Sequence, residues 1–275
     1  MMQQTLASVC TLSGIGIHSG QPCTITLHPQ MENTGIRLSR TDHPDLVLNA
    51  HPSAILGTNR ATILGNSYTK ICTPEHLLSA CVGLHLHNVW IEVSSEEIPI
   101  LDGSASCFCD AILKTGLIQQ KNTSIQKLKI LEPIHIKQNM ARLLILPSPE
   151  TRYTYVLDYP QSHIGCQTAS YSLEQNSYHT DIAPARTYGF YDELHTLLEK
   201  GLAQGGSLDC ALVIGETGYI NVPRFENEMA RHKVLDLMGD FALVGHLLEG
   251  HIIGIQSGHA LHCEGVKAIG SMFKI

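Results

Sequence analysis

The spacing of hydrophobic and polar residues changes several times along the chain. Alternation at residues 24–27 and 89–93 predicts strands that bury one face. Apolar residues spaced as on one face of a helix occupy residues 104–117, and residues 191–202 and about 225–248 also favour helices. Because strand and helix patterns are interspersed, we expect an α+β fold.

A polar segment without periodicity, residues 119–124, is the best candidate for a domain boundary. It separates an N-terminal domain, 1–122, from a C-terminal domain, 123–275. Beyond it the pattern predicts strands in residues 127–136, 143–146 and 252–255. The order of elements loosely repeats that of the first half, and 275 residues with 43% hydrophobic content suffice for two cores. We therefore expect two similar α+β domains.

Residues 188–223 carry a pattern of their own inside the second half. The predicted helix is followed by a glycine turn, Gly205-Gly206, and by the apolar stretch 211–214. This order favours a β–α–β insertion. On the residues alone, ordinary packing of an amphipathic helix on a strand explains the pattern as well.

Composition excludes several classes of function. The net charge is −7 with a pI of about 6.1, and no dense Lys/Arg cluster is present, which argues against nucleic-acid binding. No apolar run approaches 18 residues, so no transmembrane segment is expected. The nine cysteines are scattered and odd in number, and no secretory signal precedes them. We expect free thiols in the cytoplasm, and nothing implies an obligate protein partner.

The strongest chemical signal is a histidine and a carboxylate four residues apart, His232 and Asp236. On a helix their Cβ atoms lie roughly 5–6 Å apart on one face. Imidazole nitrogen and carboxylate oxygen are both zinc ligands, and a catalytic zinc usually takes three protein ligands and leaves a fourth position open. His76 is the candidate third ligand, and the adjacent Glu75 could take a proton from water.

The segment before Glu75 and His76 predicts the position of these two residues in a helix. Thr73 is a suitable N-cap and Pro74 a suitable first residue, so Glu75 and His76 should lie in the first turn of a helix that reaches about residue 82. His259, in Ser-Gly-His-Ala, is a further candidate for acid or base chemistry. A histidine and a carboxylate at this spacing often occur by chance, so the argument depends on the whole set.

Other assignments of the same residues stay open. Fe²⁺ also suits two histidines and one carboxylate. A purely structural zinc would close all four positions, usually with several cysteines, and no cysteine is near these ligands in the sequence. His85, His87 and His163 have no comparable spacing, and we expect them to be structural.

Seven sequence blocks together resemble the zinc-dependent UDP-3-O-acyl-N-acetylglucosamine deacetylases. They occur in family order and span nearly the whole chain. The blocks are GIGIHSG (14–20), TPEHLL (73–78), EIPILDGSA (97–105), ARTYG (185–189), GGSLDC (205–210), RHK (231–233) with Asp236 and Asp240, and SGHAL (257–261).

The resemblance implies a hydrolase that removes an N-acetyl group in the committed step of lipid A synthesis, with its site between two domains that each pair a sheet with helices. It implies one Zn²⁺ held by His76, His232 and Asp236, with Glu75 as the base. It further implies His259 as proton donor or cationic stabiliser.

The same resemblance assigns supporting roles. Asp240 would orient His259, and the hydroxyl of Thr187 would stabilise the oxyanion. Lys233 would meet polar or phosphate groups of the substrate, near Tyr188. The insertion would form an apolar passage for the acyl chain, lined by Leu194, Ala203, Gly206, Ser207 and Val213. A zinc amidohydrolase acting on another N-acyl compound is the alternative.

The chain departs from the usual family pattern at two places. Tyr188 stands where most members have phenylalanine, and His87-Asn88 stands where many have Asp-Asn. The chain also ends soon after His259, whereas family members often run on, so the C-terminal helix is expected to be abbreviated relative to theirs. These differences concern substrate fit more than chemistry.

Overall fold

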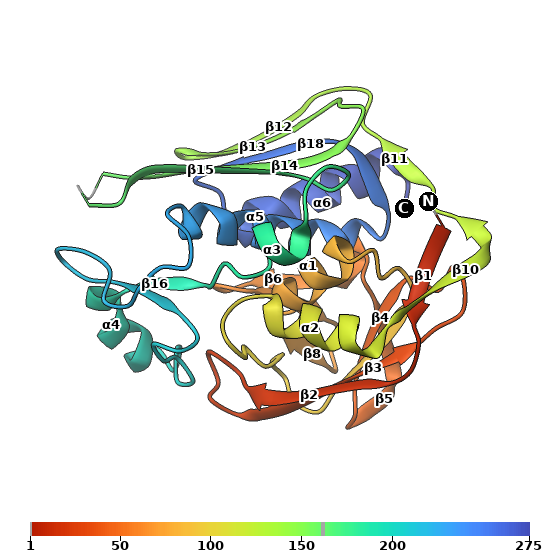
Figure 1. The fold of residues 1–275 in the computed structure, drawn as a ribbon, viewed down its shortest axis with the longest axis horizontal. Coiled ribbons are helices and arrows are strands. Elements are labelled where there is room, and N and C mark those ends of the chain that lie inside the picture. The colour runs from red at the N-terminus through yellow and green to blue at the C-terminus, as the bar shows by residue number, and fades with distance from the viewer. Residues whose placement is uncertain (1, 161–162) are drawn as a thin grey trace.

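The protein combines two large β-sheets with a layer of helices. The structure, a computed structural model, describes residues 2–160 and 163–275. Figure 1 shows the two sheets on opposite sides of the helices, with a smaller unit projecting at one end. The expected α+β class is confirmed.

The sheet of the first half has the strand order β2-β3-β9-β4-β5. Its strands are β2 (Cys10–Ile15), β3 (Pro22–Pro29), β4 (Ile36–Arg40), β5 (His43–Asn49) and β9 (Val89–Val93). Ile25, Leu27 and Ile91 are fully buried, because alternate residues of a strand point to the same face. The strands predicted at residues 24–27 and 89–93 are therefore confirmed.

Smaller elements complete the first half. Helices α1 (Glu75–Gly83) and α2 (Ser106–Thr115) pack between the sheets, and α2 confirms the helix predicted near residues 104–117. The remaining strands are β1 (Met2–Leu6), β6 (Ile55–Thr58), β7 (Thr62–Gly65), β8 (Lys70–Cys72) and β10 (Leu117–Ser124).

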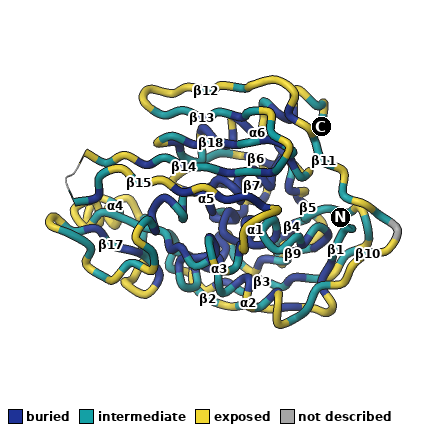
Figure 2. Tube along the Cα trace, turned by 45° about the horizontal axis from the view of Figure 1, so that its top comes forward, coloured by how far each residue is buried: buried dark blue, intermediate teal, exposed yellow. Residues whose placement is uncertain are grey.

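The sheet of the second half has the order β12-β13-β18-β14-β15, and β11 (Lys127–Lys129) pairs with the start of β18. The strands are β12 (Ile134–Gln138), β13 (Ala141–Leu146), β14 (Thr151–Tyr159), β15 (Gly165–Ser172) and β18 (Leu247–Ile255). Helices α5 (Glu228–Phe241) and α6 (His259–Phe273) cover its inner face, and a short helix, α3 (Tyr178–Asp181), precedes them. Figure 2 shows the exposed outer strand β12 and the buried helical layer.

The two large sheets repeat one topology. In each, the first two strands pair antiparallel, the last strand lies in the middle and runs parallel to the third, and the third and fourth pair antiparallel. One helix precedes the middle strand and another follows it, namely α1 and α2 around β9 and α5 and α6 around β18. The expected similarity of the halves is present in their topology, while a domain boundary at residue 122 stays a prediction.

Helices α1 and α5 occupy equivalent places in the two halves and lie in contact. The contact is close because α5 has a glycine there. A Cβ atom on Gly239 would overlap the backbone of Glu75. Leu235 and Met238 of α5 are fully buried, so α5 is held from several sides. This packing brings the first turn of α1 against the last turns of α5.

Several details of the structure differ from the predicted elements. The polar segment 119–124 belongs to strand β10, which pairs antiparallel with β1, a partner more than a hundred residues earlier in the chain. The helix expected to reach residue 248 ends at Phe241. A 3-10 turn and Gly245, at a φ of 74°, then reverse the chain into β18.

Thr73 is not the N-cap of α1. Its φ of 57° turns the chain, its hydroxyl donates to Glu97 Oε1 at 3.3 Å, and Pro74 takes the N-cap position. Glu75 and His76 nevertheless lie in the first turn of α1, as expected.

The projecting unit in Figure 1 is the insertion predicted at residues 188–223. Strands β16 (Tyr188–Phe190) and β17 (Leu212–Ile214) pair in parallel. A 3-10 turn and the short helix α4 (Leu194–Glu199) connect them, so the β–α–β order is confirmed, with a helix shorter than predicted. Among the described residues, no helix combines the length and apolar character needed to span a membrane.

Candidate metal centre and active site

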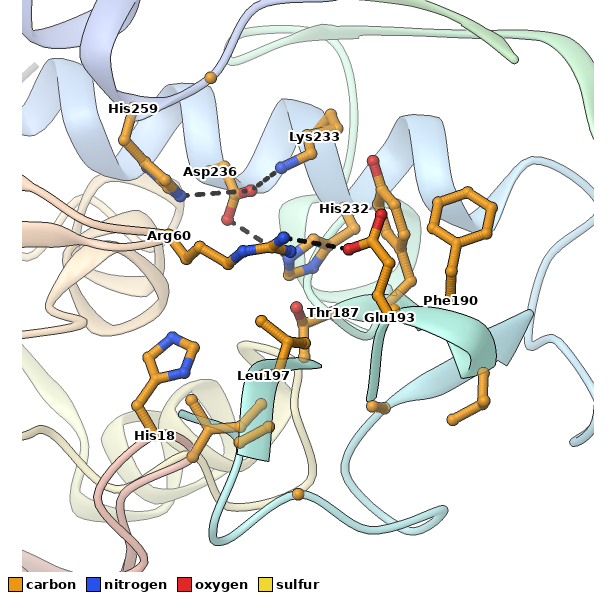
Figure 3. A pocket seen from close by; sticks show the side chains of 18 of the residues that line it. His18, Arg60, Thr187, Phe190, Glu193, Leu197, His232, Lys233, Asp236 and His259 are labelled. Atoms are coloured by element: carbon orange, nitrogen blue, oxygen red, sulfur yellow. Dashed lines mark hydrogen bonds and ion pairs between the residues drawn. The ribbon is translucent and has the colours of Figure 1, made fainter. Parts of the chain in front are cut away.

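The three predicted metal ligands converge where α1 meets α5. Asp236 Oδ1 lies 3.6 Å from His76 Nε2 and 3.3 Å from His232 Nε2, and all three side chains are buried. One donor atom from each lies within 4.8 Å of the others. Figure 3 shows His232 and Asp236 projecting from one helix, as their four-residue spacing requires.

Contacts with neighbouring groups orient this donor set. His232 Nδ1 lies 3.0 Å from the carbonyl oxygen of Ala185, which leaves Nε2 to face Asp236. A ligating histidine is usually fixed in this way through its other ring nitrogen. Lys233 donates to Asp236 Oδ2 at 2.9 Å, so Oδ1 is the oxygen that faces both imidazoles.

The charge states of these groups suit a cation. Burial lowers the pKa of His232 to about 3, so its imidazole is neutral, the form that binds a metal. Burial alone would raise the pKa of Asp236, but His232 and Lys233 hold it well below its usual value. Two imidazole nitrogens and one carboxylate oxygen are a donor set that Zn²⁺ accepts. The residues present therefore fit the expected metal.

Glu75 and His259 face each other beside this donor set. His259 Nε2 lies 3.7 Å from Glu75 Oε1 and 4.0 Å from Asp236 Oδ2. Burial raises the pKa of Glu75 to about 7. A carboxyl group with this pKa can both accept and release a proton near neutral pH.

His259 is paired with a second buried carboxylate, on Asp240. Its Nδ1 lies 2.7 Å from Asp240 Oδ2. Burial opposes the charged form of His259, but the Asp240 and Glu75 carboxylates outweigh it and raise the pKa to about 10. His259 is therefore an imidazolium at neutral pH, next to a group that can hold or lose a proton.

A cavity of about 1030 Å³ opens above these groups. Glu75, His76, His232, Asp236 and His259 line one part of it, and the insertion lines another. Every residue predicted to contact the substrate lines this cavity, namely Thr187, Tyr188, Leu194, Ala203, Gly206, Ser207, Val213 and Lys233. In Figure 3, Thr187 lies between the donor set and Leu197 of the insertion. The structure brings these residues together, and their roles remain predictions.

Lys233 and Tyr188 form a pair at the wall of the cavity. The Lys233 ammonium lies 5.5 Å from the centre of the Tyr188 ring, a cation–π contact. The Tyr188 hydroxyl lies 3.3 Å from that of Tyr159. Burial opposes the charged form of Lys233, but the Asp236 carboxylate holds its pKa well above the usual value. A fixed positive charge therefore stands beside the donor set.

Sequence reasoning missed several residues of the site. His18 and Arg60 line the cavity, and Arg60 reaches across to Glu193 of the insertion at 3.0 Å, as Figure 3 shows. Glu97 accepts hydrogen bonds from the backbone N–H groups of His18 and Ser19 at 2.9 and 2.8 Å and so holds that loop at the cavity.

The available signals explain these omissions. His18 and Glu97 lie in two of the seven sequence blocks, but the sequence does not show that they contact each other. Arg60 has no local pattern. His85, His87 and His163, expected to be structural, do not line the cavity.

A two-histidine, one-carboxylate donor set with a carboxyl group and an imidazolium beside it is the arrangement that mononuclear metal hydrolases use. Comparison with known proteins gives the family. The LpxC model, UDP-3-O-acyl N-acetylglycosamine deacetylase, matches residues 3–271, and the chain belongs to this family.

Curated relatives with the matching name align with this chain over most of their lengths. The chain is 38% identical over 275 residues to the UDP-3-O-acyl-N-acetylglucosamine deacetylase of a Nostoc species, covering 98% of each chain. It is 39% identical to the protein of that name from Thermodesulfovibrio yellowstonii, covering 97% of this chain and 91% of the relative. A Synechocystis relative of the same name is 36% identical, with 99% and 100% covered.

Proposed function

We propose that this protein is a zinc-dependent hydrolase that removes the N-acetyl group from UDP-3-O-acyl-N-acetylglucosamine, releasing acetate in the committed step of lipid A biosynthesis. The observation that carries the proposal is the convergence of His76, His232 and Asp236 beside Glu75 and His259. The family match and the names of the relatives support the substrate. Cytoplasmic location is part of the proposal, and the nine free cysteines agree with it.

In this proposal His76, His232 and Asp236 hold the metal. A bound Zn²⁺ would supply a water of lowered pKa and polarise the amide carbonyl. Neutral His232 and ionised Asp236 are already in the protonation states that such an ion requires. Fe²⁺ suits the same donors, so the identity of the metal in the cell is part of what must be measured.

Glu75 and His259 divide the proton transfers. Glu75, with a pKa of about 7, accepts the proton of the attacking water. His259, with a pKa of about 10, carries a positive charge that favours the oxyanion and can then donate a proton to the leaving amine. An N–C bond of an amide breaks only when the amine leaves as a neutral group, so a donor at this place is required.

Thr187 and Lys233 complete the polar side of the cavity. The Thr187 hydroxyl would donate to the oxyanion, a contribution that for one positioned donor is about 2.7–4 kcal/mol. Lys233, held by Asp236 at 2.9 Å, would attract polar or phosphate groups of the substrate. Tyr188 would add a hydroxyl beside the sugar position. Most family members are expected to lack this hydroxyl, because they have phenylalanine there.

The insertion supplies the apolar part of the cavity. Leu194, Ala203, Gly206 and Val213 line it together with Ser207, and all come from the segment between β16 and the end of the insertion. Each methylene buried there would contribute about 0.8 kcal/mol. The length of the acyl chain would therefore dominate substrate affinity.

A release assay tests the proposal. Purified protein should contain about one metal ion per chain and release acetate from the UDP-sugar. A chelator should abolish activity, and Zn²⁺ should restore it. Activity on the sugar nucleotide without its 3-O-acyl group should be far lower. If simple N-acyl compounds were cleaved equally well, the alternative of a general zinc amidohydrolase would replace this proposal.

A further inference from the structure

Asp240 is held from three directions inside the protein. It is fully buried. Its Oδ2 lies 2.7 Å from His259 Nδ1 and 2.8 Å from His262 Nδ1, and its Oδ1 accepts from the Thr62 hydroxyl at 2.5 Å. Because an ionised carboxylate can only accept hydrogen bonds, both imidazoles must donate from Nδ1. Asp240 therefore fixes the orientation of both rings, and they fix its own.

His262 is locked at both ring nitrogens. It lies one helical turn after His259 in α6, and its side chain is fully buried. Its Nε2 lies 2.9 Å from Ser257 Oγ. Burial lowers the pKa of His262, so the ring is neutral and the Ser257 hydroxyl donates to Nε2. The Ser257 carbonyl accepts in turn from the Tyr155 hydroxyl.

Thr62 reaches Asp240 from the other half of the protein. It is a fully buried residue of β7. Its backbone N–H points to Glu75 Oε2 at 3.3 Å while its hydroxyl donates to Asp240. One residue thus contacts the proposed base and also the carboxylate behind the proposed proton donor.

We propose that Thr62 and His262 are positioning residues that hold Asp240 in the orientation that aims His259 at the leaving amine. The proposal rests on the deacetylase function proposed above. Neither residue lines the cavity, so each acts through Asp240 and not on the substrate. A carboxylate with three fixed donors cannot rotate without losing at least one of them, and a buried donor or acceptor left unpaired is costly.

Matched variants separate positioning from packing. In His262→Asn the amide nitrogen can occupy the place of Nδ1 and still donate to Asp240. In His262→Gln the amide nitrogen lies near the place of Nε2 of the native ring, so no side-chain donor at this position reaches Asp240. Thr62→Ser keeps the hydroxyl, and Thr62→Val removes it at nearly the same shape. We expect His262→Gln and Thr62→Val to lower kcat by about 10- to 100-fold with KM and metal content unchanged.

The conservative variants, His262→Asn and Thr62→Ser, should retain kcat close to that of the wild type. Val266→Ala is the packing control, because Val266 is fully buried one turn further along α6 and has an apolar side chain. It should lower the thermal midpoint and leave kcat unchanged. Equal losses of kcat in both members of each pair, or full kcat in Thr62→Val and His262→Gln, would overturn the proposal.

Nitrogen NMR of protein labelled at histidine gives a readout that does not depend on activity. The signal lost in His262→Asn identifies His262, which should be the neutral tautomer with its proton on Nδ1. A proton on Nε2 would overturn the proposal. If the wild type released no acetate, the deacetylase function would fail first, and the tautomer would still test the contacts of Asp240.

Discussion

Gly239 of α5 lies directly against the backbone of Glu75 in α1. No side chain separates the two helices at this point, and the proposed ligand Asp236 and the carboxylate Asp240 lie within one turn on either side of the glycine. The distance between Glu75, the proposed base, and the proposed metal ligands is therefore set by a backbone contact. Any larger residue at position 239 must move α1 away from α5.

Gly239→Ala should destabilise the protein and weaken metal binding together. Overpacking of a buried contact typically costs about 1–3 kcal/mol. Thermal unfolding and metal content per chain measure the two effects. Gly218→Ala is the matched control, because a Cβ there meets no atom within 4 Å. Wild-type metal content in Gly239→Ala would show that the helices can separate without disturbing the site.

Removal of a ligand should have a different signature from removal of a proton-transfer group. His76→Ala and Asp236→Ala should lose metal, because each deletes one of three converging donors. Metal analysis after gel filtration measures this loss. Either variant with one tightly bound ion per chain would contradict the assignment of that residue as a ligand.

Glu75→Ala and His259→Ala should keep their metal and lower kcat by about 10²–10⁴, the range for one positioned acid or base. Single-turnover release of acetate at saturating substrate measures the chemical step. Retained activity in metal-loaded Glu75→Ala would show that another group accepts the proton.

The pH dependence of kcat/KM should be bell-shaped. Glu75 must be ionised, and burial raises its pKa to about 7, so activity should fall as the pH drops below that value. His259 must be protonated, and its pKa of about 10 places the alkaline limb there. Because the Asp240 charge raises that pKa, Asp240→Asn should move the alkaline limb to lower pH. An unmoved alkaline limb would mean that His259 does not produce it.

Gly206→Leu should obstruct the proposed acyl passage. A Cβ at this position already comes within 3.2 Å of the Ala203 carbonyl oxygen, so a leucine must project into the cavity or displace this turn. The fall in kcat/KM should be largest for long-chain substrate, smaller for short-chain and smallest for deacylated substrate. Gly206→Ala should lie between the wild type and Gly206→Leu. Equal losses on all three substrates would place the acyl chain elsewhere.

The sequence predicted those parts of the site that depend on local periodicity or short blocks. His232 and Asp236 share a helical face because their spacing is close to one turn. The sequence before α1 correctly placed Glu75 and His76 in the first turn of a helix. Contacts between distant segments could not be predicted. The pairing of Arg60 with Glu193 and that of Thr62 with Asp240 join residues more than 130 positions apart, and neither pair has a local pattern.

Polarity also concealed strand β10, because residues 119–124 were interpreted only as a candidate domain boundary. Its polar side chains resemble those of a linker, yet its backbone groups pair with β1, and a strand at the surface needs apolar residues on one face at most. The position of His262 was visible in the sequence, three residues after His259. Its importance became apparent only when Asp240 was placed between the two rings.

The repeated topology of the two halves has a thermodynamic consequence for the metal site. His76 comes from α1 of the first half, and His232 and Asp236 come from the equivalent helix of the second. An ion bound by all three would therefore act as a cross-link between the halves. At a free concentration one hundred times its dissociation constant, a ligand specific for the folded state adds about 2.7 kcal/mol of stability. Here that energy would oppose the separation of the two sheets, so an ion that enabled the proposed chemistry would also hold the two repeats in register.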